Sequence, residues 1–350
     1  MSYQYKKEFQ QFLVEWFQRE KRDLPWRKTK DPYKIWVSEV MLQQTRVDTV
    51  IPYYENFLEK FPTPEVLAEA EESFLLKQWE GLGYYSRARN LQAGVREVVE
   101  SYGSIVPNTR DEISKLKGVG PYTAGAVLSI AYGVPEHAVD GNVMRVLSRV
   151  LLIEDDIALP KTRKVFEKAV MDLIDPDHPS DFNQGLMELG ALVCTPTSPK
   201  CLLCPVCDYC GAFAEGRTAE LPVKVKKTKV KKLHYDVYVI ENEAGQICME
   251  QRPATGLLAN MWQFPMVEQT ADYSGIAQYT KEHEIELHGQ EELVELKHIF
   301  SHIVWHLKTF YVKGESKSGK WFTLDEIEHL PLPVPMQKIL QSYRVHTKKL

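Results

Sequence analysis

Apolar residues recur at helical spacing through the first 215 residues of the chain. The clearest amphipathic face is made by Val143, Val146, Leu147, Val150 and Leu151. Asp31 and Pro32 precede a second helical segment over 33–44, where an aspartate cap and a proline at the first position favour helix initiation. Because no convincing alternating pattern interrupts this region, residues 1–215 are predicted to be helical.

The pattern changes in the last third of the chain. Apolar and polar residues alternate over 235–240 and 306–312, which is typical of strands with one buried face. Helical spacing returns near 273–283 and 334–343. Residues 232–350 are therefore predicted to form a second domain that mixes helices and strands.

A basic linker over 216–231 separates the two regions. After Leu221 and Pro222 it contains almost no acids, and its lysines, with the first one beyond it, are Lys224, Lys226, Lys227, Lys229, Lys231 and Lys232. Such a segment can be a solvated tether or can lie along a phosphate backbone, and the sequence leaves both interpretations open.

Composition limits the class of protein. A length of 350 residues favours two domains, and the net charge of −5 does not by itself indicate a nucleic-acid partner, although a local basic surface can suffice. No apolar run approaches the roughly 18 residues of a membrane span, and the N-terminal residues are polar. Six cysteines without a secretory signal favour a reducing compartment. We therefore expect a cytoplasmic protein with no targeting signal and no membrane contact.

Five cysteines lie close together and suggest a metal centre. Cys194, Cys201, Cys204 and Cys210 follow the spacing C-x6-C-x2-C-x5-C, which satisfies the four-thiolate demand of a [4Fe–4S] cluster. Cys207 offers a rival set, because with Cys201, Cys204 and Cys210 it forms three C-x2-C steps that could hold zinc or a cluster. From spacing alone, both ligand sets remain possible.

A glycine-containing turn joins two helical patterns over 116–124. Gly118 and Gly120 allow a tight turn, and the helix that follows would present backbone N–H groups to a phosphate. Pro121 has no N–H, so one donor is missing there. Taken alone, such a turn is more often a simple helix connector.

Two carboxylates are candidates for acid–base chemistry. Asp140 precedes the amphipathic helix, where it can be a plain N-cap or an ionised group favoured by the helix dipole. Glu39 lies among aromatic and aliphatic residues on a predicted helix. If Glu39 is buried, its pKa is raised and it becomes a plausible proton donor; otherwise it is an ordinary surface glutamate.

Several ordered motifs resemble the MutY-type adenine glycosylases of the helix-hairpin-helix (endonuclease III) superfamily. The segments that carry the resemblance are L-P-W-R at 24–27, W-V-S-E-V-M-L-Q-Q-T at 36–45, G-L-G-Y-Y-S-R-A-R-N at 81–90 and L-K-G-V-G-P-Y-T-A at 116–124. The last departs from the usual motif at Lys117 and Pro121. The resemblance covers nearly the whole chain and implies DNA repair by base excision.

The implied fold is multidomain. An all-α helix-hairpin-helix glycosylase region would span 1–215, with a six-helix barrel at about 25–132 and an iron–sulfur subdomain from 1–24 and 133–215. An α+β MutT (Nudix)-like domain would follow over 232–350, carried by motifs at 256–265 and 298–302. This domain lacks the glutamate-rich box of a pyrophosphohydrolase, so we expect it to recognise a lesion rather than hydrolyse a nucleotide.

The resemblance also assigns catalytic roles. Glu39 would act as general acid and then base at adenine, and Asp140 would stabilise, or transiently bond, the sugar C1′. Tyr122 stands where bifunctional relatives carry a lysine; because tyrosine cannot form a Schiff base, a monofunctional hydrolase is expected. Asn142 and Tyr122 would orient these groups.

Recognition residues follow from the same comparison. Base flipping requires a pocket, a wedge and contacts to the opposite base. The resemblance implies that the adenine pocket is formed by Trp26, Arg27 and Gln184. It implies that the wedge and the contacts to the opposite base come from Gln44, the adjacent Thr45, Leu82 and Tyr84. Phosphate would be bound at Gly118 and Gly120, and 8-oxoguanine by Phe300, Ser301 and His302.

Cofactor and partners complete the expectation. The resemblance favours Cys194, Cys201, Cys204 and Cys210 as [4Fe–4S] ligands, with Cys207 spare, and a monovalent cation at the hairpin. The expected partner is double-stranded DNA with an adenine:8-oxoguanine or adenine:guanine mispair, bound by a nucleoid-associated monomer. Two alternatives remain: an endonuclease III-type pyrimidine glycosylase with lyase activity, and a non-enzymatic iron–sulfur protein that binds lesions.

Overall fold

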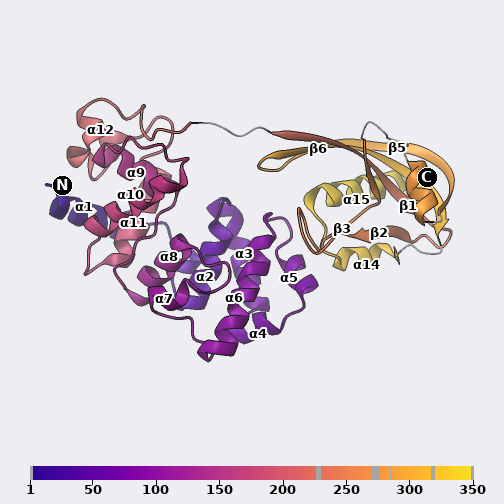
Figure 1. Ribbon diagram of the computed structural model, residues 1–350, viewed down its shortest axis with the longest axis horizontal. Coiled ribbons are helices and arrows are strands. Elements are labelled where there is room, and N and C mark those ends of the chain that lie inside the picture. Colours follow the sequence, from indigo (N-terminus) through magenta and orange to yellow (C-terminus); the bar gives the residue numbers. More distant parts are fainter. Residues whose placement is uncertain (1–2, 226–229, 270–275, 284, 317–319, 348–350) are drawn as a thin grey trace. The chain divides into compact units, whose positions relative to one another are not determined.

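A computed structural model describes residues 3–225, 230–269, 276–283, 285–316 and 320–347. The chain divides into two compact units, each described below by itself (Figure 1). The first comprises Met1–Glu69 and Asn90–Lys226, and the second comprises Ala70–Arg89 and Lys227–Leu350.

The first unit is helical throughout its described residues, as the sequence predicts. Its α-helices are α1 (Lys6–Glu20), α2 (Pro32–Leu42), α3 (Val47–Lys60), α4 (Pro64–Glu69), most of α6 (Ser86–Tyr102), α7 (Arg110–Ile113), α8 (Pro121–Tyr132), α9 (Gly141–Leu151), α10 (Arg163–Leu173), α11 (Pro179–Leu192) and α12 (Gly211–Ala214). Short 3₁₀ turns are η1 (Pro25–Arg27), η2 (Pro160–Thr162), η3 (Cys201–Leu203) and η4 (Cys207–Tyr209). The predicted cap is present, because the Asp31 carboxylate accepts hydrogen bonds from the backbone N–H groups of Tyr33 and Lys34.

One apolar core unites the two ends of this unit. Helix α1 packs against α11, and α11 packs against α9 and α8 (Figure 1). The predicted face of α9 is buried here, together with α1 residues such as Phe9 and Phe17. The N-terminal helix and a segment more than 130 residues later therefore form one structural layer.

The second unit contains a seven-stranded sheet within its described residues, in the order β3-β2-β1-β6-β5 with β4 paired to β1 and β7 to β2. The strands are β1 (Lys231–Glu241), β2 (Ile247–Gln251), β3 (Trp262–Gln263), β4 (Met266–Glu268), β5 (Ile285–Ile299), β6 (Ile303–Ser316) and β7 (Lys320–Phe322). Strands β1 and β6 are parallel and the other pairs are antiparallel. The helices are α13 (Ile276–His283), α14 (Leu324–His329) and α15 (Val334–Thr347).

Both predicted strands of the C-terminal region exist, and each is longer than its alternating core. Val237 and Val239 of β1 face one apolar cluster that includes Met336 and Ile339 of α15. The predicted helix near 273–283 corresponds to α13; residues 270–275 lie outside the described part.

The segment Ala70–Arg89 belongs to the same compact unit as the C-terminal residues. It contains α5 (Glu72–Gln78) and the start of α6. Arg89 donates a hydrogen bond of 2.9 Å to the carbonyl oxygen of Ala259, and Asn260 donates one of 2.6 Å to Glu72. The compact units thus cut across the sequence boundary at 216–231.

Candidate active site

Glu39 and Tyr122 meet between α2 and α8. The Tyr122 hydroxyl donates a hydrogen bond of 2.5 Å to Oε2 of Glu39, and the glutamate is only 5% exposed. Burial raises the pKa of Glu39 to about 7, against the opposing effect of the Tyr122 hydrogen bond. Near neutral pH this carboxyl can therefore hold a proton and release it.

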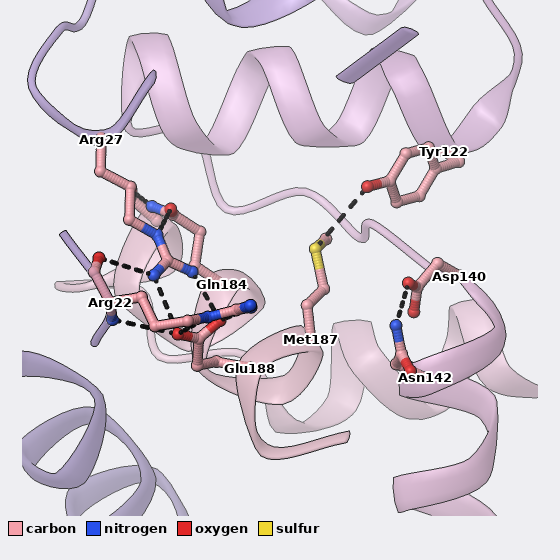
Figure 2. Close-up of polar contacts among 9 residues, drawn as sticks. Arg22, Arg27, Tyr122, Asp140, Asn142, Gln184, Met187 and Glu188 are labelled. Atoms are coloured by element: carbon pink, nitrogen blue, oxygen red, sulfur yellow. Dashed lines mark hydrogen bonds and ion pairs between the residues drawn. The ribbon is translucent and has the colours of Figure 1, made fainter. Parts of the chain in front are cut away.

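Asp140 caps the N-terminus of α9. Its Oδ1 accepts the Val143 N–H at 2.7 Å, and its Oδ2 accepts an N–H of Asn142 at 2.9 Å (Figure 2). Burial raises the pKa of Asp140, while these two hydrogen bonds lower it. Asp140 can therefore be both a helix N-cap and a catalytic carboxylate. It caps α9, and its charge also raises the pKa of Glu39.

Two glycines allow the helices to approach closely enough to form this arrangement. A Cβ atom on Gly125 of α8 would lie 1.7 Å from the carbonyl oxygen of His137. A Cβ atom on Gly190 of α11 would lie 2.6 Å from Cβ of Asn142. Larger residues at either position would push α8 or α11 away from the segment that carries Asp140 and Asn142.

The Tyr122 phenol remains neutral. Burial first, and then the nearby carboxyls of Glu39 and Asp140, raises its pKa well above the usual value. Its hydroxyl also lies 3.7 Å from the sulfur of Met187 on α11 (Figure 2). Tyr122 therefore supplies a fixed hydrogen-bond donor to Glu39.

Glu188 forms ion pairs with two arginines, and the charge of one of them, Arg27, also acts on Glu39. Arg27 donates to both carboxylate oxygens of Glu188, at 3.0 and 2.9 Å, and Arg22 does the same at 2.9 and 2.7 Å (Figure 2). Arg27 also donates to Oε1 of Gln184 at 3.3 Å, and the Gln184 amide donates to Ser180 at 3.1 Å. The two arginines hold the pKa of Glu188 down at about 2, although burial opposes them.

Arg27 and Gln184 were predicted from sequence motifs, whereas Arg22, Met187 and Glu188 are recognised only in the structure. An available signal was the position of Glu188 in the apolar run L-M-E-L-G-A-L of α11. An acid on a buried helix face requires a cationic partner. Which arginines provide it could not be read from the sequence, since they lie 161 and 166 residues away.

A chain of hydrogen bonds leads from Asp140 to the cysteine region. Arg145 donates to Oδ1 of Asn142 at 2.8 Å and to the Cys194 carbonyl oxygen at 2.8 Å. The fully buried Arg149 donates to the Cys194 sulfur at 3.2 Å and to the Thr195 carbonyl oxygen at 2.8 Å.

All five cysteines of this region, Cys207 included, line one cavity. Burial, with smaller contributions from Cys194, Cys210 and Cys207, raises the pKa of Cys204 to about 12. Within the described residues, no three Cys, His, Asp or Glu side chains converge tightly enough to hold one metal ion. A [4Fe–4S] cluster takes one thiolate per iron and so accepts more widely separated sulfurs than tetrahedral zinc does.

The hairpin over 116–124 forms as predicted, with one difference. Gly118 adopts φ +77°, but Gly120 has φ −88° and serves as the N-cap of α8. The turn therefore needs a left-handed residue at one of its two glycines. Pro121 occupies the first position of α8, where the absent N–H leaves no broken helical bond.

The other predicted binding residues fall into two groups. In the first unit, Trp26 is buried against Tyr54, and Gln44 follows α2 with φ +58°, beside Thr45. In the second unit, Ser301 and His302 form the exposed tip between β5 and β6, closed by the Phe300 N–H on the Ile303 carbonyl oxygen at 2.8 Å.

Leu82 and Tyr84 belong to that second group. The Tyr84 hydroxyl makes a hydrogen bond with the Ser301 hydroxyl, although the two residues are 217 positions apart. Leu82 is buried, whereas Tyr84 is exposed. Residues 81–86, 89, 256–258, 298–302 and 333–335 enclose a cavity of about 350 Å³. The structure thus brings two separately predicted recognition motifs to one cavity.

Comparison with known proteins identifies relatives for both regions. Residues 37–176 match the HhH-GPD superfamily of base excision DNA repair proteins, and residues 236–342 match the NUDIX domain. The chain is 35% identical to an adenine DNA glycosylase of Rattus norvegicus, covering 97% of this chain and 78% of that protein. It is 33% identical to an adenine DNA glycosylase of Buchnera aphidicola subsp. Schizaphis graminum, covering 96% and 99%.

Solved structures agree with the fold of the helical region. A thermostable thymine-DNA glycosylase is similar at 31% identity and a TM-score of 0.55, covering 60% of this chain and 97% of that one. An endonuclease III bound covalently to DNA is similar at 28% identity and a TM-score of 0.51, covering 60% and 98%. Together with the HhH-GPD and NUDIX matches, these structures confirm the predicted fold class, in which a helix-hairpin-helix region precedes a MutT-like domain. No helix in the described part of the chain is long and apolar enough to cross a membrane.

Proposed function

Because this chain belongs to the adenine DNA glycosylase family, we propose that its substrate is adenine opposite 8-oxoguanine or guanine in duplex DNA. The chain hydrolyses N-glycosyl bonds in base excision repair, as its relatives' shared name and the HhH-GPD match establish. The identity of the base opposite adenine is the part that we propose here. It is supported by the shared cavity of Tyr84 and Ser301 in the second unit.

The buried Glu39–Tyr122 pair carries the chemical part of this proposal. A pKa of about 7 keeps a substantial fraction of Glu39 protonated at neutral pH. Protonation of adenine at N7 would turn the base into a good leaving group, and the resulting carboxylate could then accept a proton from the attacking water. Tyr122 orients Oε2 for both steps through its hydrogen bond of 2.5 Å.

Asp140 is proposed to stabilise the positive charge that develops on the sugar. Its two hydrogen bonds favour the ionised form at the N-terminus of α9. A negative group close to C1′ lowers the barrier to an oxocarbenium-like transition state and can form a transient bond there. Asn142 holds one carboxylate oxygen while Arg145 holds Asn142.

Tyr122 also supports a monofunctional reaction. A lyase needs an amine that attacks C1′ and forms a Schiff base. The residue that contacts Glu39 is a phenol, which has no nitrogen to form such a bond. We therefore expect hydrolysis to leave an intact abasic site.

A [4Fe–4S] cluster is proposed at Cys194, Cys201, Cys204 and Cys210. When bound, it would cross-link the segment after α11 through four sulfurs. Arg149 supports this assignment, because a buried guanidinium against the Cys194 sulfur would stabilise a thiolate ligand. Hydrolysis itself requires no electron transfer. The proposed cation at the hairpin and the nucleoid location rest on the family resemblance alone.

A duplex that carries one adenine:8-oxoguanine pair tests this function. Incubation followed by hot alkali should break the adenine strand at one position, and omission of alkali should leave it intact. A matched duplex with an adenine:guanine pair should be cleaved more slowly, and one with an adenine:thymine pair should not be cleaved. Equal cleavage of all three duplexes would exclude mispair specificity, and a break without alkali would exclude a monofunctional enzyme.

A further inference from the structure

Glu80 forms two hydrogen bonds that take no part in the proposed reaction, one with Leu332 and one with Lys77. It directly precedes Gly81, the first residue of the loop that carries Leu82 and Tyr84. Its Oε1 accepts the Leu332 N–H at 2.7 Å, and its Oε2 accepts a hydrogen bond from Lys77 at 2.9 Å. Both carboxylate oxygens are therefore engaged, and the side chain is 18% exposed.

Lys77, like Glu80, binds the short connector between α14 and α15, which contains Leu330 and Leu332. Its ammonium group also donates to the Leu330 carbonyl oxygen at 3.1 Å. Lys77 and Glu80 thus hold the short connector between α14 and α15 from two sides, one through a carbonyl and one through an N–H. Hydrogen bonds in which one partner is charged are shorter and stronger than those between neutral groups.

This connector leads directly into a wall of the cavity. Residues 333–335 follow Leu332 without a break and line the same cavity as the 81–86 loop. Glu80 therefore ties together two cavity walls that are about 250 residues apart in sequence.

The loop that follows Glu80 has an uncommon backbone conformation and its own internal hydrogen bonds. Tyr84 adopts φ +48°, an uncommon conformation for a residue with an aromatic side chain. Within the loop, the Trp79 indole donates to the Gly83 carbonyl oxygen at 3.2 Å, and Arg87 donates to the same oxygen at 3.1 Å. These bonds fix the shape of the loop, and the hydrogen bond between the Tyr84 and Ser301 hydroxyls joins it to the β5–β6 tip.

We propose that Glu80 is a positioning residue that fixes the Leu82–Tyr84 loop against the β5–β6 tip and thereby determines discrimination of the base opposite adenine. This inference rests on the proposed role of the Tyr84–Ser301 cavity in recognising that base. The two hydrogen bonds of Glu80 described above join it to Leu332 and Lys77. Its removal should therefore affect selectivity more than chemistry.

The test uses the full chain with three variants. Glu80→Ala removes both bonds, and Glu80→Gln keeps an oxygen acceptor for the Leu332 N–H. Glu71→Ala is the matched control, because Glu71 is an exposed acid on the same segment whose side chain makes no capping bond. Affinity is measured on duplexes with a non-hydrolysable adenosine analogue opposite 8-oxoguanine or guanine. Hydrogen–deuterium exchange of residues 81–85 is measured in the free proteins.

In Glu80→Ala we expect about tenfold weaker binding opposite 8-oxoguanine, equivalent to about 1.4 kcal/mol, and at most about twofold opposite guanine. Exchange over 81–85 should accelerate, Glu80→Gln should recover most of the affinity, and Glu71→Ala should match wild type. Equal losses on both duplexes, unchanged affinity on both, or unchanged exchange over 81–85 would overturn the proposal. If wild type itself ignores the opposite base, the proposed mispair specificity fails, and the exchange measurement alone decides whether Glu80 positions the loop.

Discussion

Arg27 and Glu188 form a two-point ion pair in which both carboxylate oxygens and both terminal guanidinium nitrogens take part. The glutamate side chain is 2% exposed, and Arg22 binds the same two oxygens. This relationship links the turn η1 to α11 and fixes the guanidinium whose Nε reaches Gln184.

Removal of the Glu188 carboxylate should leave two arginines without their counter-charge. We expect Glu188→Ala to lower the free energy of unfolding by about 3–5 kcal/mol, the usual cost of breaking a buried pair. Adenine excision should fall at least tenfold in the folded fraction, because Arg27 loses its orientation. Chemical denaturation and single-turnover assays measure the two effects.

Acid should weaken the same interaction. The pKa of Glu188 is lowered from 4.5 to about 2, so the pair stabilises the fold fully above pH 4.5 and its contribution is lost as pH falls toward 2. Glu188→Gln should therefore lose much less stability than wild type over this interval. A parallel pH dependence in the two proteins would contradict this assignment.

Excision should depend on pH through Glu39. Because its pKa is raised from 4.5 to about 7, the protonated form required for acid catalysis disappears as pH rises above 7. Single-turnover rates at saturating enzyme should fall about tenfold per pH unit well above that value. A rate that stays constant up to pH 9 would exclude Glu39 as the acid.

Tyr122→Phe provides the matched control for that profile. The Tyr122 hydrogen bond lowers the pKa of Glu39, so its removal should raise the pKa and move the falling limb to higher pH. The maximal rate should also fall, because Oε2 loses the hydrogen-bond donor that orients it. A limb displaced to lower pH would contradict the described geometry.

Glu39→Gln should separate catalysis from stability. Loss of the general acid should slow excision by about 10²–10⁴-fold. Between pH 4.5 and about 7 the folded wild-type protein retains a proton that the unfolded chain has released, so wild-type stability decreases as pH rises through this interval. The neutral amide of Glu39→Gln avoids this loss. The melting temperature of the variant minus that of wild type should therefore be higher at pH 8 than at pH 5. Thermal unfolding at the two pH values measures the difference.

Cysteine variants test the ligand set. Cys194→Ser should reduce iron content and the absorbance of the cluster, whereas Cys207→Ser should leave both near wild type. The Cys207 sulfur lies 3.6 Å from Oδ1 of Asp208, which would disfavour a thiolate there. Cys248→Ser, in the second unit, is the control for loss of a buried thiol. Equal iron loss in Cys194→Ser and Cys207→Ser would require a different ligand assignment.

Sequence alone determined the division into a helical region and a mixed region, several of the individual elements, and a set of candidate chemical groups. The amphipathic face of α9, the Asp31 cap and the alternation in β1 and β6 depend on local periodicity and were predictable for that reason. Glu39, Tyr122 and Asp140 could be selected from motifs, since these residues stand in short recognisable contexts.

Tertiary structure decided how these groups act. The burial that raises the pKa of Glu39 and its bond to Tyr122, 83 residues away, require α2 and α8 to pack together. The Arg27–Glu188 pair and the association of Ala70–Arg89 with the C-terminal unit also join residues more than 150 positions apart. Local patterns encode which face of an element is apolar, but partner choice depends on the energy of the whole packed chain, which no single segment contains.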